Sequence, residues 1–246
     1  CKRVYLREIT LLKEKMPSFH AYPFSLPLVR KMNKLYLRRP VTFFVGENGS
    51  GKSTLLEGIA YQCGFNPAGG GRNNVYEVDR SESALGDYLR LSWNPKVTNG
   101  FFLRAESFYS FASHIDDVAA TRAYGGVSLH SQSHGESFLS LFKYRFGSRG
   151  IYLLDEPEAA LSPARQLSLM RIIHDLSDRA QFIIATHSPI LMGYPDADIL
   201  SFDGDQLEQI RYEDTDHYQI TRRFLENRNS VLRTLFEDED EGEDIS

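Results

Sequence analysis

Cysteine is scarce in this 246-residue chain, which contains only Cys1 and Cys63. Two cysteines are too few for a disulfide framework or a cysteine-rich zinc site, so we expect neither to hold the fold together. The sequence also lacks any run of about 20 apolar residues, the length that spans a bilayer. Its N-terminus has no apolar segment typical of a secretory signal. We therefore expect a cytoplasmic protein without an intrinsic membrane segment.

Basic residues are absent from the acidic run at residues 237–244, which holds seven Asp or Glu. Such a segment has too little apolar surface to offset its ordering entropy, so we expect residues 237–246 to form a disordered tail. The first 40 residues have the opposite bias, with ten Lys or Arg against two Glu and a net charge of +8. This basic lobe is a candidate nucleic-acid surface. Solvated strand faces of a domain that is basic by chance explain the same charge equally well.

Short apolar runs alternate with helical patterns along the middle of the chain. Val41–Val45 is a run bounded by Pro40 and Gly46, as expected of a buried parallel strand, and the pattern of a helix follows over Ser53–Tyr61. Similar strand runs recur at residues 101–103, 151–154 and 181–185, and residues 161–178 have a helical pattern. Strands separated by helices indicate an α/β fold with a mostly parallel sheet flanked by helices.

The N-terminal residues have a different pattern, because prolines interrupt their apolar runs. Residues 4–12 and 24–37 are predicted to be short strands, and proline confines such strands to edges, turns or bulges. We expect an antiparallel side sheet in the basic β lobe, residues 1–40. Residues 199–210 have the pattern of a terminal hairpin around Asp-Gly-Asp. A single domain is expected over residues 1–236.

A glycine-rich segment fits the phosphate-loop pattern G-x-x-x-x-G-K-[ST] directly between a predicted strand and a predicted helix. The predicted phosphate-binding residues are Gly46, Glu47, Asn48, Gly49, Ser50, Gly51, Lys52, Ser53 and Thr54. Glycines let backbone N–H groups fold around phosphate oxygens, and the helix N-terminus adds its positive dipole end. Lys52 would reach the β- and γ-phosphates, and the Ser53 hydroxyl would bind Mg²⁺. A glycine-rich turn that binds nothing is the alternative, which the flanking strand and helix disfavour.

A second acidic motif follows an apolar strand, at Ile151–Glu158. This octet has the pattern of a Walker B strand followed by a catalytic Glu. Asp155 would hold the Mg²⁺, and Glu156 would orient and deprotonate the attacking water. Successive strand residues point to opposite faces, so the two carboxylates can serve different tasks. An acidic helix start after a strand is the alternative for a lone Asp-Glu pair.

At this point the chain resembles the ABC-type P-loop ATPases, over nearly all of residues 1–225. Residues 159–163 look like that family's D-loop, and Thr186-His187-Ser188 looks like its switch histidine. The resemblance implies that ATP and Mg²⁺ are the cofactors, that ATP is hydrolysed, and that His187 senses the γ-phosphate. It also implies a homodimer that holds two ATP molecules between its subunits.

The family's signature motif has an altered form here, Gln132-Ser133-His134-Gly135-Glu136, within an expected short helical region at residues 107–146. Ser133 and Gly135 keep the positions that, in the family, bind the γ-phosphate held by the other subunit. His134 departs from the family's glycine. His130 and His134 have helical i,i+4 spacing that could bind a metal, but no third histidine or cysteine is nearby, so zinc is disfavoured.

No glutamine stands where the family has its Q-loop. Glu106 is the nearest candidate to contact Mg²⁺ and the attacking water, and Arg104 or Ser107 could contribute instead. A strand-end salt bridge is the structural alternative. For the adenine ring, the aromatic candidates upstream of the P-loop are Tyr22, Phe24 and Tyr36, and core packing is the expected role of any one of them.

Only 26 residues separate Glu106 from Ser133. SMC-like heads place long heptad-patterned segments in this interval, and transporter domains a larger helical subdomain. The chain is more similar to small stand-alone cytoplasmic ATPases of bacteria. We expect a soluble ATPase in a nucleic-acid-related process such as repair or defence. The alternatives are the ATP-binding subunit of a membrane transporter and a nucleotide-dependent switch that binds a protein partner.

Overall fold

The structure is a computed structural model that describes residues 4–65, 70–71, 85–104 and 149–240. The chain forms two compact units, residues 1–209 and 210–246. This division lies after Gln209, whereas we expected one domain over residues 1–236. Three site predictions and the expected insertion lie outside the described residues: Glu106, Ser133, Gly135 and residues 107–146. The alternatives at Ser107, His130 and His134 lie outside them as well.

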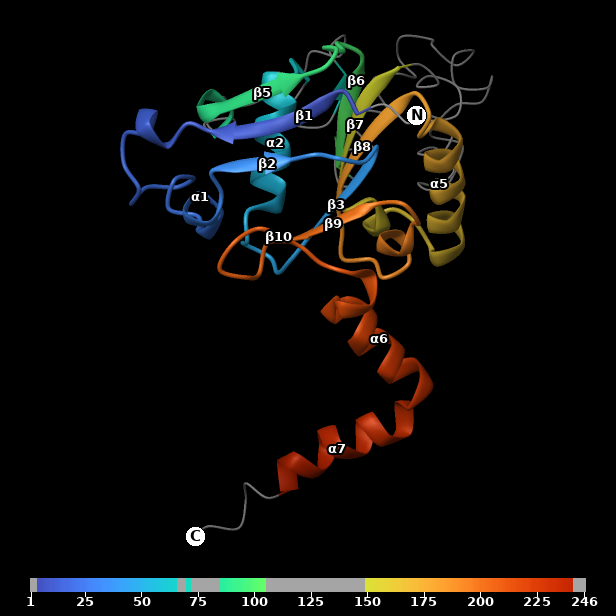
Figure 1. The fold of residues 1–246 in the computed structure, drawn as a ribbon. Helices are drawn as coiled ribbons and strands as arrows, with labels where there is room; N and C mark the ends of the chain where they lie inside the picture. Colours follow the sequence, from blue (N-terminus) through green and yellow to red (C-terminus); the bar gives the residue numbers. More distant parts are fainter. Residues whose placement is uncertain (1–3, 66–69, 72–84, 105–148, 241–246) are drawn as a thin grey trace, which may run out of the picture. The chain divides into compact units, whose positions relative to one another are not determined.

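Within the described ranges, seven strands form the main sheet, in the order β10-β9-β3-β8-β7-β6-β4 (Figure 1). They are β3 (Val41–Val45), β4 (Gly70–Gly71), β6 (Gly100–Arg104), β7 (Gly150–Asp155), β8 (Ala180–Ala185), β9 (Asp198–Ser201) and β10 (Glu208–Gln209). The pairs from β9 to β6 are parallel, and β4 and β10 are antiparallel at the two edges. The predicted mostly parallel sheet is confirmed, as is the terminal hairpin, which β9 and β10 form.

A second, antiparallel sheet has the order β2-β1-β5. Its strands are β1 (Leu6–Leu11), β2 (Lys34–Tyr36) and β5 (Leu89–Trp93). The expected side sheet is present, but one of its strands, β5, lies beyond residue 40. The strand predicted over residues 24–37 is wrong for most of its length. Residues Pro27–Lys31 form the short helix α1, because proline at the first helical position is already constrained to a helical φ.

Helix α2 (Lys52–Gln62) lies between the two sheets and follows the P-loop directly (Figure 1). One side of α2 contacts β5, and the other contacts β6, β7 and β8. Its Leu55, Leu56 and Ile59 are fully buried in the core that the two sheets share. The helix is thus fixed on both sides, which holds its N-terminus, and the P-loop attached to it, in place.

Helix α5 (Pro163–Leu176) buries Leu169 and Ile173. Ser162 caps its N-terminus by accepting a hydrogen bond from the Arg165 N–H at 3.3 Å, and Pro163 occupies the first turn. Single 3₁₀ turns are η1 (Lys13–Lys15), η5 (Pro157–Ala159), η6 (Leu191–Gly193) and η7 (Tyr212–Asp214). None of the helices in the described ranges is long and apolar enough to cross a bilayer.

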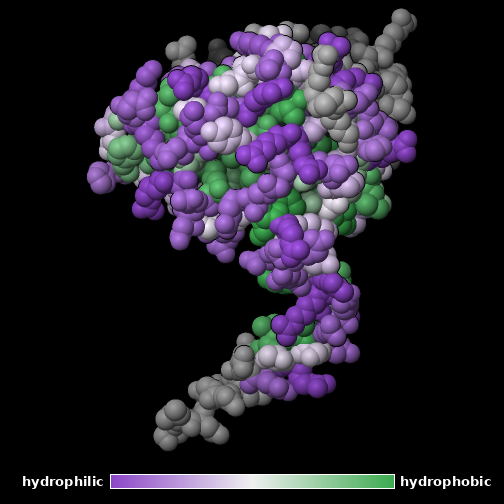
Figure 2. Space-filling view, viewed as in Figure 1, coloured by the Kyte–Doolittle hydropathy of each residue, from purple (hydrophilic) through white to green (hydrophobic). Residues whose placement is uncertain are grey.

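The second unit contains α6 (Asp216–Glu226) and α7 (Arg228–Asp240). Figure 2 shows apolar surface on these helices, and the exposed large apolar side chains of the unit are Ile220, Phe224, Leu225, Leu235 and Phe236. The acidic run that we expected to be disordered is helical as far as Asp240. Once a helix has formed, each added residue gains a hydrogen bond, so α7 continues into the first acids of the run.

Candidate functional site

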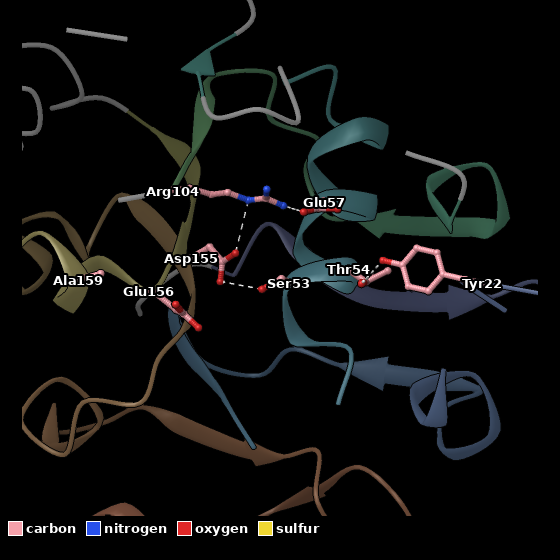
Figure 3. A pocket seen from close by; sticks show the side chains of 8 residues that line it. All are labelled: Tyr22, Ser53, Thr54, Glu57, Arg104, Asp155, Glu156 and Ala159. Atoms are coloured by element: carbon pink, nitrogen blue, oxygen red, sulfur yellow. Dashed lines mark hydrogen bonds and ion pairs between the residues drawn. The ribbon is translucent and has the colours of Figure 1, made fainter. Parts of the chain in front are cut away.

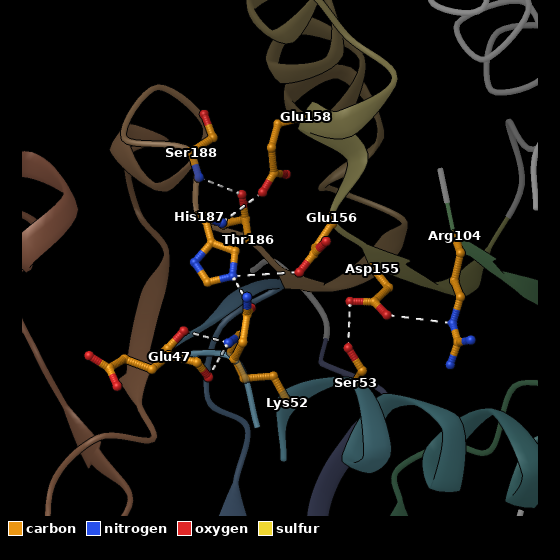
Figure 4. A network of polar contacts seen from close by, with 12 residues as sticks. Glu47, Lys52, Ser53, Arg104, Asp155, Glu156, Glu158, Thr186, His187 and Ser188 are labelled. Atoms are coloured by element: carbon orange, nitrogen blue, oxygen red, sulfur yellow. Dashed lines mark hydrogen bonds and ion pairs between the residues drawn. The ribbon is translucent and has the colours of Figure 1, made fainter. Parts of the chain in front are cut away.

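The predicted phosphate and carboxylate motifs meet at the carboxyl ends of β3, β7 and β8 (Figure 4). Strand β8 lies between β3 and β7, so the loop that contains His187 lies between the P-loop and the Asp155-Glu156 pair. Parallel strands end at the same edge of a sheet, which is where open α/β sheets bind ligands. Motifs more than 100 residues apart in the sequence therefore form one site.

The P-loop glycines have backbone conformations that L side chains rarely adopt, with φ of 82° at Gly49 and 105° at Gly51. A Cβ on Gly51 would lie 2.8 Å from the Cβ of Leu28 in α1. Gly51 is therefore required both by its left-handed conformation and by the close approach of α1. It turns the chain into α2, whose free N–H groups face the loop.

Lys52 is nearly buried, and its side chain folds back into the loop (Figure 4). Its Nζ donates hydrogen bonds to the carbonyl oxygens of Gly46 and Glu47, at 2.5 and 3.0 Å. Burial lowers the pKa of the Lys52 ammonium, and the nearby carboxylates of Asp203 and Glu156 oppose that shift. Asp203 also accepts a hydrogen bond from the Glu47 N–H at 2.8 Å. The sequence had indicated Asp203 only as a turn residue of the hairpin.

Two oxygen ligands suited to Mg²⁺ lie together beside the loop. Ser53 Oγ is 3.1 Å from Asp155 Oδ1, and both side chains line a cavity of about 340 Å³ (Figure 3). Hydroxyl and carboxylate oxygens are ligands that Mg²⁺ prefers, and it is usually bound through only one or two protein groups together with substrate phosphates. The donor set at this position therefore fits Mg²⁺. Among the described residues, those that line the cavity are Tyr22, Ser53, Thr54, Glu57, Arg104, Asp155, Glu156 and Ala159.

Glu156 directly follows β7 and has left-handed backbone angles, φ 52° and ψ 54°. This conformation costs a non-glycine residue on the order of 1–3 kcal/mol and is typical of functional sites. Its N–H donates to the Ala185 carbonyl at 2.9 Å, which ties the end of β7 to that of β8. The Glu156 carboxylate is partly exposed and lines the same cavity as Asp155.

His187 lies between the P-loop and Glu156. Its Nε2 is 3.1 Å from Asn48 Oδ1 and 3.5 Å from Glu156 Oε1. The backbone N–H of His187 donates a hydrogen bond to Glu158 Oε1 at 2.7 Å. Burial raises the pKa of the Glu158 carboxyl. The structure thus brings Asn48, Glu156 and His187 together, although their roles stay predictions. Glu158, which holds the histidine backbone, was not predicted as a site residue.

Arg104 forms a strand-end salt bridge, which is the structural alternative to a Q-loop role. It pairs with Glu57 of α2, and its Nε lies 3.5 Å from Asp155 Oδ2 (Figure 3). The arginine ends β6, opposite Asp155 on β7. The sequence did not indicate Glu57 or Asp155 as the partners of Arg104.

The three aromatic candidates for adenine have different environments. Phe24 is buried and packs edge-on against Tyr88, with the ring centroids 4.9 Å apart, so its role in the core is confirmed. Tyr36 is exposed on β2. Tyr22 is 68% exposed and lines the cavity, and its hydroxyl lies 3.4 Å from Thr54 Oγ1. Core packing is therefore wrong for both Tyr36 and Tyr22.

Several basic side chains of the basic lobe make contacts within the protein. Lys31 donates to the Phe202 carbonyl at 2.8 Å, and Lys34 pairs with Glu8 at 3.1 Å. Arg39 pairs with Asp198 at 3.3 Å. Arg30 and Arg38 are exposed, and Lys2 and Arg3 lie outside the described residues. Part of the positive charge in this lobe therefore serves the fold.

Two family models match parts of the chain. Residues 23–113 match the model described as "AAA domain", and residues 127–193 match "AAA domain, putative AbiEii toxin, Type IV TA system". The first match contains the P-loop, and the second contains Asp155, Glu156 and His187. The chain therefore resembles the P-loop ATPases of the AAA type. No curated protein matches it.

Solved structures that match the chain include the SMC head domain from Thermotoga maritima, with 14% identity and a TM-score of 0.45. That match covers 84% of this chain and 98% of the other. The CbiO1 structure from Clostridium perfringens, part of the ABC transporter complex CbiONQ, has 18% identity and a TM-score of 0.49. It covers 96% of this chain and 100% of the other.

Proposed function

We propose that the chain binds and hydrolyses Mg-ATP, with Glu156 as the general base. The observation that carries this proposal is the convergence of the P-loop, the Ser53–Asp155 pair, Glu156 and His187 around one edge of the sheet. A P-loop alone would support nucleotide binding. The carboxylate beyond β7 and the histidine that faces it support hydrolysis.

Binding would rest on the loop and the start of α2. Backbone N–H groups and the helix N-terminus surround the phosphate oxygens, and the Lys52 ammonium supplies a positive charge. The two loop carbonyls that now accept hydrogen bonds from Lys52 keep its ammonium inside the loop. Ser53 and Asp155 would hold Mg²⁺, which neutralises charge that develops on the β- and γ-oxygens.

Hydrolysis would need a positioned water molecule. Glu156 orients that water and accepts its proton as the oxygen attacks the γ-phosphorus. His187 donates a hydrogen bond to the γ-phosphate, and Asn48 and Glu156 hold its ring near the P-loop. Glu158 fixes the backbone at His187 and so limits the movement of the ring.

Phosphate release is the direct test of this chemistry. Parent protein with saturating ATP should release phosphate in Mg²⁺ and none above background in EDTA, because the proposed reaction needs the ion at Ser53 and Asp155. Turnover that is equal in EDTA would contradict the metal site. Absence of turnover in the presence of bound Mg-ATP would contradict hydrolysis by this chain alone.

The resemblance further supports an ATP-dependent homodimer, in which Ser133 and Gly135 of one copy close over the ATP of the other. Glu156→Gln should accumulate as that dimer, because the nucleotide at the interface is no longer removed. Adding Ser133→Arg should restore the monomer and leave ATP bound at the P-loop. Light scattering with and without Mg-ATP measures the oligomeric state of both variants. A Glu156→Gln protein that stays monomeric with ATP bound would contradict the dimer.

We further propose a nucleic-acid-related process, such as repair or defence, for which the exposed Arg30 and Arg38 are the structural support. The second candidate is a protein-interaction switch, favoured by the exposed apolar side chains of α6 and α7. A transporter subunit would require a membrane partner. Adding duplex DNA to the phosphate-release assay distinguishes these candidates. A higher rate of ATP hydrolysis with DNA supports the nucleic-acid-related process, and an unchanged rate contradicts it.

A further inference from the structure

Four polar side chains that line the cavity are joined in a chain of contacts (Figure 3). Ser53 and Glu57 come from α2, where an i,i+4 spacing places them on the same helix face. Arg104 and Asp155 come from β6 and β7, where they are register partners at the carboxyl ends of two parallel strands. The helix face and the strand ends therefore each present two groups to the other.

The contacts run continuously through these four residues. Ser53 Oγ is 3.1 Å from Asp155 Oδ1, and Arg104 Nε is 3.5 Å from Asp155 Oδ2. Arg104 also pairs through its Nη2 with Glu57 Oε1. One oxygen of Asp155 therefore faces the P-loop hydroxyl, and the other faces a guanidinium that a second carboxylate holds.

Burial makes the charge balance of this arrangement important. The side chains of Glu57, Arg104 and Asp155 are 11%, 17% and 8% exposed. A charge with so little contact with water is costly unless an opposite charge compensates it. Glu57 offsets the charge of Arg104, so the guanidinium beside Asp155 repels an incoming cation less than it would without that carboxylate. The planar guanidinium suits this geometry, because its rigid fork can contact two carboxylates at once.

We propose that Glu57 and Arg104 are a positioning pair for the metal site. Arg104 holds Asp155 Oδ2 so that Oδ1 stays beside Ser53, where Mg²⁺ would bind. Glu57 anchors Arg104 and offsets its positive charge beside the position of the incoming cation. The inference rests on the proposed function, since it concerns the same Ser53–Asp155 site. It assigns neither residue a contact with substrate.

Glu57→Gln is the informative substitution. The amide keeps the size of the side chain and removes its charge, which takes away one of the carboxylates that face the Arg104 guanidinium beside the metal site. Loss of a partner in the outer shell of a metal site typically costs about 10–100-fold in metal affinity. Adding Arg104→Gln to this variant should recover part of the loss, because it removes the repelling charge.

The measurement is the Mg²⁺ concentration that gives half-maximal enhancement of ATP binding, obtained by calorimetry, together with ATP affinity in EDTA. We expect Glu57→Gln to raise that Mg²⁺ midpoint by about 10-fold or more and to leave the affinity in EDTA within a few-fold of the parent's. The matched control is Arg171→Gln, which breaks an exposed arginine ion pair with Asp175 on α5. It should change neither quantity.

An unchanged Mg²⁺ midpoint in folded Glu57→Gln would overturn the proposal. So would an equal loss of ATP affinity in EDTA and in Mg²⁺, which would indicate a role in the phosphate loop or the fold. If Glu57→Gln does not fold, Arg104→Lys provides the test. One ammonium cannot contact two carboxylates as the forked guanidinium does, so this variant should also raise the Mg²⁺ midpoint. A parent protein whose ATP binding does not respond to Mg²⁺ would instead contradict the proposed function.

Discussion

The imidazole Nε2 of His187 lies 3.5 Å from Oε1 of Glu156. The same nitrogen lies 3.1 Å from Oδ1 of Asn48, so one ring atom joins the P-loop to the residue after β7. A γ-phosphate bound in the loop would compete for this nitrogen. On the proposed function, the histidine would therefore couple occupation of the phosphate site to the carboxylate proposed as the base.

His187→Ala should lower kcat by about 10²-fold, the usual effect of losing one donor to charge that develops in a transition state. ATP affinity should change little, because the P-loop and Lys52 remain. Steady-state kinetics and calorimetry measure the two effects separately. His174→Ala, an exposed histidine on α5, is the matched control. A loss confined to ATP affinity would assign His187 to ground-state binding instead.

Lys52→Ala should abolish ATP binding in a folded protein, because it removes the buried ammonium at the centre of the loop. Lys15→Ala removes an exposed lysine and should leave binding unchanged. Calorimetry with ATP measures the affinity. Circular dichroism verifies the fold, which is needed because Lys52 also bonds two loop carbonyls. Parental affinity in a folded Lys52→Ala protein would show that ATP binds elsewhere.

Glu158→Gln should change how stability depends on pH. Burial raises the pKa of Glu158 above its ordinary value of 4.5, so its stabilising contribution is fully present below that value and is lost as pH rises through the raised pKa. The glutamine cannot ionise, and its amide oxygen can still accept the His187 N–H. The free energy of unfolding of Glu158→Gln, relative to the parent's, should therefore rise with pH across this window. Urea denaturation at a series of pH values measures this difference, and a relative fall with rising pH would contradict the assignment.

Arg30 and Arg38 are the exposed arginines of the basic lobe on which a nucleic-acid surface depends. If both contact phosphates, replacing each by Gln should lower the log–log slope of duplex-DNA affinity against salt by about 0.9. Lys34→Gln is the control, because Glu8 already pairs with that lysine. Binding measured by fluorescence anisotropy at several salt concentrations gives the slopes. An unchanged slope, or no binding at low salt, would contradict this surface.

The central strands and the P-loop could be predicted from sequence because their signals are local. An apolar run followed by glycines and Lys52 specifies a strand, a turn and a helix within about 20 residues. Asp155 and His187 were located in the same way, each directly after an apolar run. The parallel sheet then brings these strand ends to one edge, which the alternation of strands and helices already indicated.

The supporting contacts could not be predicted, because they depend on register and packing between distant segments. The Arg104–Glu57 pair joins a strand end to a helix face 47 positions earlier, and the contact of Asp203 with Glu47 spans 156 positions. Nothing in the spacing of these residues indicates a partner. The helix that begins at Pro27 could not be predicted for a different reason, since proline begins helices as well as interrupting strands.

The rate of phosphate release by Glu156→Gln, measured at saturating Mg-ATP beside the parent protein, tests the central claim most directly. The amide can still hold the water but cannot accept its proton, so we predict a rate about 10²–10⁴-fold lower, with ATP affinity close to the parent's. Glu14→Gln, at an exposed glutamate in η1, should release phosphate at the parental rate. Release by Glu156→Gln at the parental rate would contradict the account and remove Glu156 as the base.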